Sequence, residues 1–202
     1  ATRLFRAGAA TSNITPRLGI SINGHFNDRA AVNIHDELRA RCLALDDGQT
    51  RLAIVVCDSC MIPREVMDTA KHLIAQRTGI AKDRVLISAT HTHTAPTCAG
   101  VFQSDADKGY QQFLAARIAD GVQCAVNNLA PAKIGWDAGQ VPGEVFNRRW
   151  RMKPGTIPPN PFGTTNDLVK MNPPAGSPDL IEPAGPVDPE VSVVSVRSAD
   201  GR

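Results

Sequence analysis

The sequence has almost no net charge and lacks long hydrophobic runs. Its 202 residues carry 22 basic and 20 acidic side chains, a formal net charge of +2, and no run rich in lysine or arginine. This balance gives no electrostatic reason to expect binding to nucleic acid. The longest apolar runs, such as residues 52–57, are far too short to span a bilayer. With 42% apolar and 21% charged residues, the composition predicts one globular domain with a real core.

Several common catalytic and structural motifs are also absent. The sequence has no Gly-rich phosphate loop, no Gly-x-Ser-x-Gly elbow and no internal repeat. Its five cysteines are an odd number, which fits poorly with a closed disulfide framework. Cys57 and Cys60 have the spacing of redox and metal sites, but they follow an apolar strand, where buried free thiols are common. We therefore favour plain core thiols over a redox or metal role for this pair.

The order of apolar residues predicts an α/β (α+β) fold, in which a mixed β-sheet packs against helices. An Asp-Gly turn at residues 46–49 predicts a hairpin between two strands. Two helices are expected at 63–78, between Pro63 and a C-cap at Gly79, and at about 108–129, with an apolar stripe at spacings of three and four. The expected strands lie at residues 5–14, 38–45, 52–56, 85–88, 133–137 and 191–196.

Residues 141–189 differ in character from the rest of the chain. Eleven of the fifteen prolines fall in this Pro-rich long loop, which exceeds an ordinary connection in a compact domain. A linker, a disordered segment and an ordered loop over an active site all remain open. After the last strand, Asp200-Gly201 predicts a hairpin turn whose returning strand is missing. We therefore expect residues 1–202 to be the N-terminal part of a larger catalytic domain whose remainder follows residue 202.

The residues with the strongest chemical signal are His91 and His93, in the sequence Ala-Thr-His-Thr-His-Thr directly after the strand at 85–88. Histidines two apart share a face, and carboxyl ends of strands commonly border sites in α/β sheets. Neutral imidazole is a good zinc ligand, but a catalytic zinc usually takes three protein ligands and water. Spacing alone leaves a metal site and a hydrogen-bonded loop equally open. The flanking threonines, whose hydroxyls can orient imidazoles, favour the site.

Four other polar residues are weaker candidates. Asp58 ends the strand at 52–57, and could orient one histidine if that strand neighbours 85–88; a plain turn residue is an equal alternative. His35 could be a third ligand, although we favour a structural role. His25 and His72 look incidental, with His72 on the solvent side of its helix.

The one basic-aromatic cluster is residues 147–151, Asn-Arg-Arg-Trp-Arg. Arg148 or Arg149 could bind a carboxylate, a phosphate or a polar head group. A solvated basic stretch is the structural alternative, and the residues alone do not separate the two interpretations.

Six motifs together resemble a known family. In order they read AGAATSNITP, IHDELRAR, VVCD, SATHTHTAP, NR and VDPE, at residues 7–16, 34–41, 55–58, 88–96, 147–148 and 187–190. Over nearly the whole chain they resemble the N-terminal region of neutral/alkaline, non-lysosomal ceramidases. The Thr-His-Thr-His segment is the most specific part. Two stretches depart from the family pattern: Thr-Ala-Pro at 94–96, where Ser-Gly-Pro is frequent, and the Pro-rich residues 153–186.

The resemblance implies a Zn²⁺-dependent amidohydrolase that cleaves the N-acyl bond of ceramide, in sphingolipid metabolism. It implies that His91 ligates zinc, that His93 contacts the reacting group, and that Arg148 is an active-site arginine. The family's other ligands (a second histidine, a glutamate and a tyrosine) and its catalytic serine would lie beyond residue 202.

Two alternative functions stay open: a metal-dependent hydrolase of another, non-lipid amide or ester, and a non-catalytic binding module that keeps the ceramidase-like scaffold. The expected partners are a small-molecule or lipid substrate, a membrane surface contacted peripherally, and the rest of the polypeptide or a companion chain, which would complete the site. The first residue is Ala1, and removal of a signal peptide would account for this; a secreted or periplasmic protein is therefore expected.

Overall fold

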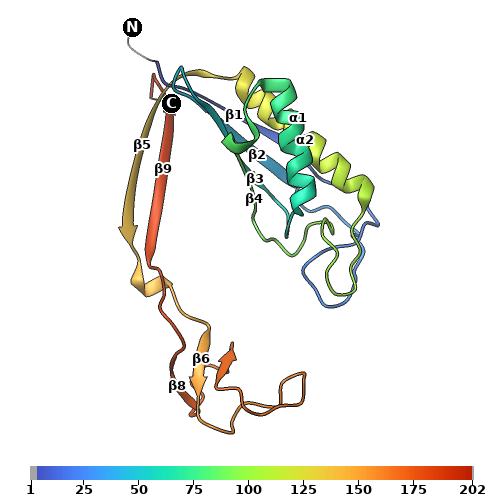
Figure 1. Cartoon of the computed structure of the whole chain (residues 1–202), viewed down its shortest axis with the longest axis vertical. Helices are drawn as coiled ribbons and strands as arrows, with labels where there is room; N and C mark the ends of the chain where they lie inside the picture. The colour runs from blue at the N-terminus through green and yellow to red at the C-terminus, as the bar shows by residue number, and fades with distance from the viewer. Residues whose placement is uncertain (1–3, 202) are drawn as a thin grey trace. The chain divides into compact units, whose positions relative to one another are not determined.

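The mixed sheet and the two helices expected from the sequence are both present. The computed structural model describes residues 4–201, which divide into unit 1 (residues 4–134 and 196–201) and unit 2 (Gly135–Ser195). Figure 1 follows the elements along the chain. Within residues 4–201, no helix is long and apolar enough to cross a membrane.

The main sheet has six strands in the order β4-β3-β2-β1-β5-β9. The strands are β1 (Arg6–Asn13), β2 (Arg39–Asp46), β3 (Arg51–Cys57), β4 (Val85–Ala89), β5 (Ala130–Gln140) and β9 (Glu190–Ser198). β1, β2 and β3 pair antiparallel, with the predicted hairpin between β2 and β3, whereas β3 and β4 are parallel. The sheet is therefore mixed, as predicted.

A parallel pair needs a crossover, and α1 (Arg64–Thr78), followed by the 3-10 turn η1 (Lys82–Arg84), supplies it between β3 and β4. Pro63 is the N-cap of α1 rather than its first helical residue. Gly79 is the predicted C-cap: its φ is 75° and its N–H donates to the carbonyl of Ala75. This crossover brings the carboxyl ends of β3 and β4 to the same edge of the sheet.

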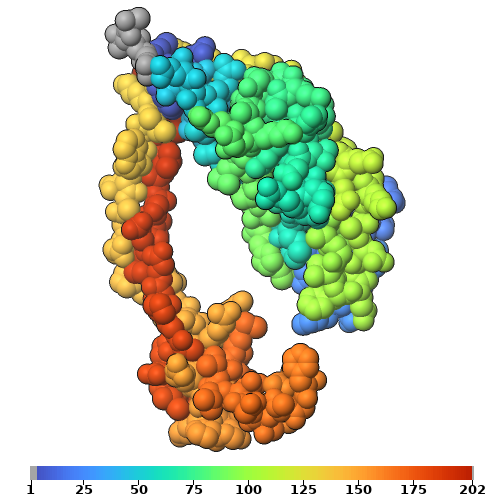
Figure 2. All heavy atoms as spheres, viewed as in Figure 1, coloured from blue at the N-terminus to red at the C-terminus, as the bar shows by residue number. Residues whose placement is uncertain are grey.

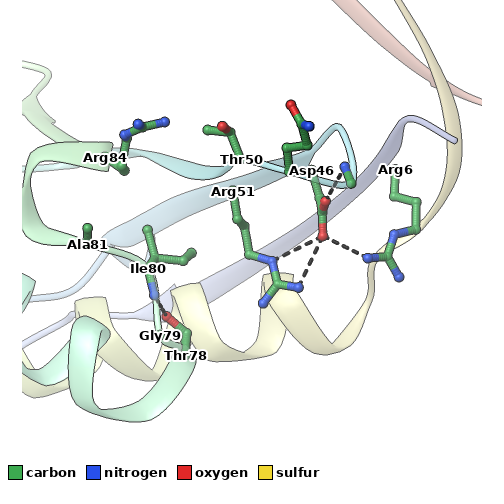
Figure 3. A pocket seen from close by; sticks show the side chains of 11 residues that line it. Arg6, Asp46, Thr50, Arg51, Thr78, Gly79, Ile80, Ala81 and Arg84 are labelled. Atoms are coloured by element: carbon green, nitrogen blue, oxygen red, sulfur yellow. Dashed lines mark hydrogen bonds and ion pairs between the residues drawn. The ribbon is translucent and has the colours of Figure 1, made fainter. Parts of the chain in front are cut away.

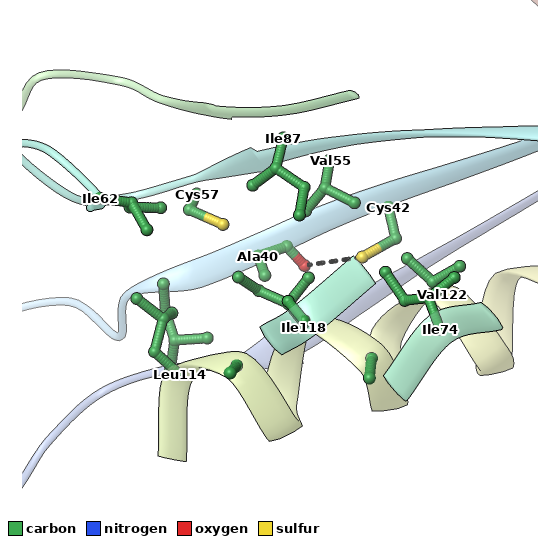
Figure 4. Close-up of a cluster of buried hydrophobic side chains, with 14 of the residues drawn as sticks. Ala40, Cys42, Val55, Cys57, Ile62, Ile74, Ile87, Leu114, Ile118 and Val122 are labelled. Carbon is green, nitrogen blue, oxygen red and sulfur yellow. Dashed lines mark hydrogen bonds between the residues drawn. The ribbon is translucent and has the colours of Figure 1, made fainter. Parts of the chain in front are cut away.

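The core lies between the sheet and its two helices (Figure 4). The second helix, α2 (Lys108–Asn127), contacts α1, β1 and β2, and the space-filling view shows α1 and α2 side by side on unit 1 (Figure 2). The predicted stripe of α2 is buried at Tyr110, Leu114, Ile118, Val122 and Ala125. Burying each large apolar side chain contributes about 1.5 to 3 kcal/mol, so this face fixes the position of the helix.

The sequence predicts one long loop at residues 141–189, but the structure shows three short strands there, within unit 2. Besides the turn η2 (Pro142–Glu144), this segment contains β6 (Arg149–Met152), β7 (Val169–Met171) and β8 (Leu180–Pro183), which form an antiparallel sheet in the order β7-β6-β8. Strands of three or four residues are too short to show alternation in a sequence. Here backbone pairing, rather than an apolar pattern, defines them.

Candidate metal centre

The histidine loop leaves the sheet where two parallel strands end. Cys57, the last residue of β3, pairs with Ala89, the last residue of β4. The N–H of Thr90 donates to the carbonyl of Cys57 at 3.0 Å, which extends this pairing by one step. His91 follows with a φ of +62°, in the left-handed region. Such a conformation costs a non-glycine residue about 1 to 3 kcal/mol and is concentrated at functional sites.

One hydrogen bond sets the orientation of the His91 ring. Its Nδ1 lies 2.9 Å from the carbonyl oxygen of Cys60. Because a carbonyl can only accept, Nδ1 carries the proton, and in the neutral ring the lone pair is on Nε2. A backbone carbonyl behind the ring is a common support for a metal-binding histidine. The hydroxyls of Thr92 and Thr94 bond to each other at 2.9 Å, and among the described residues no threonine hydroxyl is hydrogen-bonded to either imidazole ring.

His93 turns its own Nε2 toward the same point. The two Nε2 atoms of His91 and His93 are 3.3 Å apart, and the ring planes are inclined at 77°. Two nitrogens that bind one tetrahedral zinc at 2.0–2.1 Å lie about 3.3 to 3.4 Å from each other. The pair therefore has the spacing of two donors around a single ion, so these residues fit zinc.

A cysteine joins this pair. One donor atom each from Cys60, His91 and His93 lies within 4.8 Å of the others. The Cys60 side chain is buried, and burial raises the pKa of its thiol. Cys57 lies instead in the apolar core, where burial raises its thiol pKa to about 12. The preference for two plain core thiols therefore holds for Cys57, whereas Cys60 faces the histidines.

Two residues that border His93 carry no functional signal in the sequence. His25 is not incidental, contrary to the sequence prediction, because its Nε2 lies 3.2 Å from the carbonyl oxygen of His93 and the two rings meet edge to face. Gly24 has a φ of +98°, and a Cβ at this position would come within 2.4 Å of His93 Cγ. The Asn-Gly dipeptide at 23–24 was visible in the sequence, but its contact with His93 was not. His72 is exposed on α1, as expected.

Asp58 and His35, the two candidates for supporting roles, contact other groups. β3 does neighbour β4, as the interpretation of Asp58 required. However, the Asp58 carboxylate accepts hydrogen bonds from the Arg39 N–H (2.9 Å) and from the Arg41 guanidinium (2.7 Å), and within residues 4–201 it bonds to no histidine. His35 has a side chain that is 93% exposed and pairs with Asp36 at 2.8 Å. Asp58 therefore joins β3 to β2, and His35 lies on the surface.

Arg148 belongs to unit 2, whereas both histidines belong to unit 1. It is exposed and directly precedes β6, where its carbonyl accepts the N–H of Asn172 at 2.7 Å. The next residue, Arg149, begins β6, and its N–H donates to the side chain of Asn147. The active-site role of Arg148 stays a prediction.

A pocket of about 430 Å³ lies at the other end of the main sheet from the histidine loop, where β2 ends and β3 begins (Figure 3). Its central charge is the buried carboxylate of Asp46, which contacts Arg6 at 2.7 Å and Arg51 at 3.0 Å. The hydrogen bond from the Gly48 N–H, aided by the two arginines, lowers the pKa of Asp46. These bonds join the ends of β1, β2 and β3, so we assign the cluster to the fold.

Comparison with known proteins agrees with this architecture. The family model described as neutral/alkaline non-lysosomal ceramidase, N-terminal, matches residues 5–151. A neutral ceramidase of Mycobacterium tuberculosis is 27% identical over an alignment 134 residues long, and the match covers 60% of this chain and 21% of that protein.

Two solved structures share the fold. The neutral ceramidase from Pseudomonas aeruginosa matches with a TM-score of 0.69 and 21% identity, over 100% of this chain and 31% of that one. A ceramidase complexed with C2 matches with a TM-score of 0.66 and 21% identity, over 98% and 30% of the respective chains. The chain thus spans less than a third of the length of these relatives. Because the family model covers most of its residues, the chain belongs to the neutral/alkaline non-lysosomal ceramidase family, within the N-terminal region.

Proposed function

We propose that this chain carries the first metal-binding residues of a zinc-dependent amidohydrolase that cleaves the N-acyl amide bond of ceramide or a related lipid. The observation that carries the proposal is the approach of the His91 and His93 Nε2 atoms to 3.3 Å, with the other nitrogen of His91 bonded to a backbone carbonyl. Membership of the ceramidase family supports the choice of an amide bond.

His91 would hold the metal through Nε2, because its Nδ1 proton is engaged by Cys60. When bound, zinc supplies Lewis acidity and lowers the pKa of a water molecule. A group held beside His91 Nε2 is within hydrogen-bond reach of His93, which can orient the substrate carbonyl or donate to its developing oxyanion. Arg148, a permanent cation, is proposed to stabilise the same negative charge.

An exposed aromatic pair supports a lipid rather than a polar substrate. Phe26 directly follows His25, which contacts His93. The ring centroids of Phe26 and Phe102 are 4.6 Å apart. The two side chains are 75% and 72% exposed. Contiguous exposed apolar surface is the kind of surface that binds lipids and membranes. We propose that they contact the hydrocarbon chains of the substrate, or the membrane surface that presents it.

The test compares His91→Ala with His72→Ala in the full-length protein, using zinc content by plasma mass spectrometry and hydrolysis of a short-chain ceramide. His72 is an exposed histidine of α1 and serves as the matched control. We expect His91→Ala to lose the zinc and the ceramidase activity, and His72→Ala to keep both.

Unchanged zinc in His91→Ala would remove the metal assignment. A higher kcat/KM for a polar N-acetyl amide than for ceramide would favour the non-lipid hydrolase. Full-length wild-type protein without metal or activity would favour the binding module.

A further inference from the structure

The segment that borders His93 is held in place by one buried asparagine, Asn23. The next two residues touch His93: Gly24 lies against its ring, and His25 Nε2 lies 3.2 Å from its carbonyl oxygen. Resting on the function proposed above, we propose that Asn23 is a positioning residue of the active site. It anchors this segment so that the His93 ring keeps its place beside His91 Nε2.

Backbone pairing brings the segment to the histidine loop. The N–H of Asn23 donates to the carbonyl of Ala95 at 3.0 Å, and the N–H of Thr97 donates to the carbonyl of Ser21 at 2.8 Å. These two bonds form a short antiparallel ladder. Because Ala95 lies only two residues after His93, the ladder determines which residues of the segment face the imidazole.

The side chain of Asn23 adds a second anchor, further along the same loop. Its Nδ2 donates to the carbonyl of Ala99 at 3.0 Å and to Ser104 Oγ at 3.2 Å. The Ser104 hydroxyl in turn donates to the carbonyl of Val101 at 2.8 Å. Its proton is therefore engaged, so the hydroxyl accepts from Asn23, and the two acceptors together fix which end of the amide is the nitrogen.

Burial makes these bonds specific rather than incidental. Asn23 is 0% exposed and Ser104 is 3% exposed. Within residues 4–201, the amide oxygen of Asn23 has no hydrogen-bond partner. A buried amide with an unpaired acceptor is a costly choice for stability alone, and an apolar side chain would avoid that cost. The two donated bonds, which tie the segment to the loop, are what an apolar side chain could not supply.

Loss of this anchor should act on His93 and spare the metal. The segment after Asn23 touches the ring and the carbonyl of His93, whereas the His91 ring is oriented by the carbonyl of Cys60 from a different loop. Zinc binding through His91 should therefore survive a change at Asn23, while the orientation of the substrate carbonyl by His93 should not.

The test compares Asn23→Ala with Asn128→Ala in the full-length protein, using a short-chain ceramide. Asn128 is the matched control, because its amide also donates to a backbone carbonyl at 3.0 Å, that of Ala9, and joins α2 to β1 instead of to the histidine loop. We expect Asn23→Ala to lower kcat about 10- to 100-fold with KM changed less than about threefold, since a misplacement of about 1 Å can cost about 100-fold. Its zinc content should equal that of the wild type. Asn128→Ala should keep kcat, KM and zinc.

Hydrogen exchange followed by mass spectrometry gives a readout that does not depend on activity. Peptides that span residues 90–104 should exchange faster in Asn23→Ala than in the wild type or in Asn128→Ala. If Asn23→Ala does not fold, Ser104→Ala decides by the same criteria. It removes one of the two acceptors, so its effects should have the same direction and a smaller size.

Three results for Asn23→Ala would overturn the proposal. An unchanged kcat would exclude the positioning role. A raised KM with unchanged kcat would mean that Asn23 orders the exposed ring of Phe102 instead of His93. Loss of zinc together with kcat would place its effect on the metal centre. A wild type without ceramidase activity would remove the proposed function instead, and unchanged exchange in Asn23→Ala would then overturn the anchor as well.

Discussion

The two units of this chain are built by different means. In unit 1, helices and strands bury a continuous apolar cluster, and the histidine loop leaves the sheet at its edge. In unit 2, Met152 is the one apolar side chain that is buried among the described residues, while Trp136, Val193 and Val194 are largely exposed. Packing therefore fixes unit 1, whereas backbone pairing fixes unit 2. The first should tolerate substitution poorly and the second well.

The largest effect is expected in the core of unit 1. Leu114 is 0% exposed, and Leu114→Ala leaves a cavity between α2 and the sheet. Cavity-forming substitutions of this type cost about 2 to 5 kcal/mol, and we expect about 3. Urea unfolding followed by circular dichroism measures the loss of unfolding free energy. Gln112→Ala, on the exposed side of α2, should change it by less than about 0.5 kcal/mol. A loss below about 1 kcal/mol for Leu114→Ala would contradict a packed core.

The next effect concerns the Asp46 cluster and depends on pH. Because the folded-state pKa of Asp46 is lowered, its contribution is fully present above its unfolded pKa of about 3.9 and is lost as pH falls through the folded pKa. Asp46→Asn should cost about 2 kcal/mol at pH 7, since charged hydrogen bonds contribute 1.5–3 kcal/mol. The difference from wild type should shrink below pH 4.

Asp83→Asn, an exposed carboxylate in η1, is the control for Asp46→Asn and should change stability little at any pH. An Asp46→Asn deficit that is equal at pH 3 and pH 7 would mean that the Asp46 charge is not the stabilising element.

A smaller and more local effect is expected at Gly24. Gly24→Ala places a Cβ against His93, the residue proposed to orient the substrate carbonyl, and should lower kcat/KM of the full-length protein for a short-chain ceramide by about 10- to 100-fold, since a displacement of about 1 Å in a catalytic site can cost about 100-fold. Gly19→Ala is a close control, because Gly19 also has a positive φ, of +81°, but no atom of the described residues lies within 4 Å of the added Cβ. Both variants should lose about 1 kcal/mol of stability from backbone strain, and Gly24→Ala should lose more because the His93 ring must shift to admit the Cβ. Equal kcat/KM in the two variants would show that Gly24 does not position His93.

The same division explains what the sequence could predict. Elements of unit 1 were predictable because burial imposes an order on apolar residues, such as the stripe of Leu114, Ile118 and Val122 along α2. The contact between Cys60 and His91 could not be predicted, because these residues are 31 positions apart and meet only through the parallel register of β3 and β4. In unit 2, strands of three and four residues carry too few side chains to leave a pattern.

The smallest effect tests unit 2 directly. Val193 lies in β9 and is 54% exposed, so Val193→Ala removes little buried area. Val193→Ala should change the free energy of unfolding by no more than about 0.5 kcal/mol. The measurement uses the 202-residue chain, as for Leu114→Ala. The two substitutions both shorten an aliphatic side chain, and they differ mainly in burial. A loss above about 1.5 kcal/mol would mean that Val193 is packed in solution. Side-chain packing would then stabilise unit 2 as it stabilises unit 1.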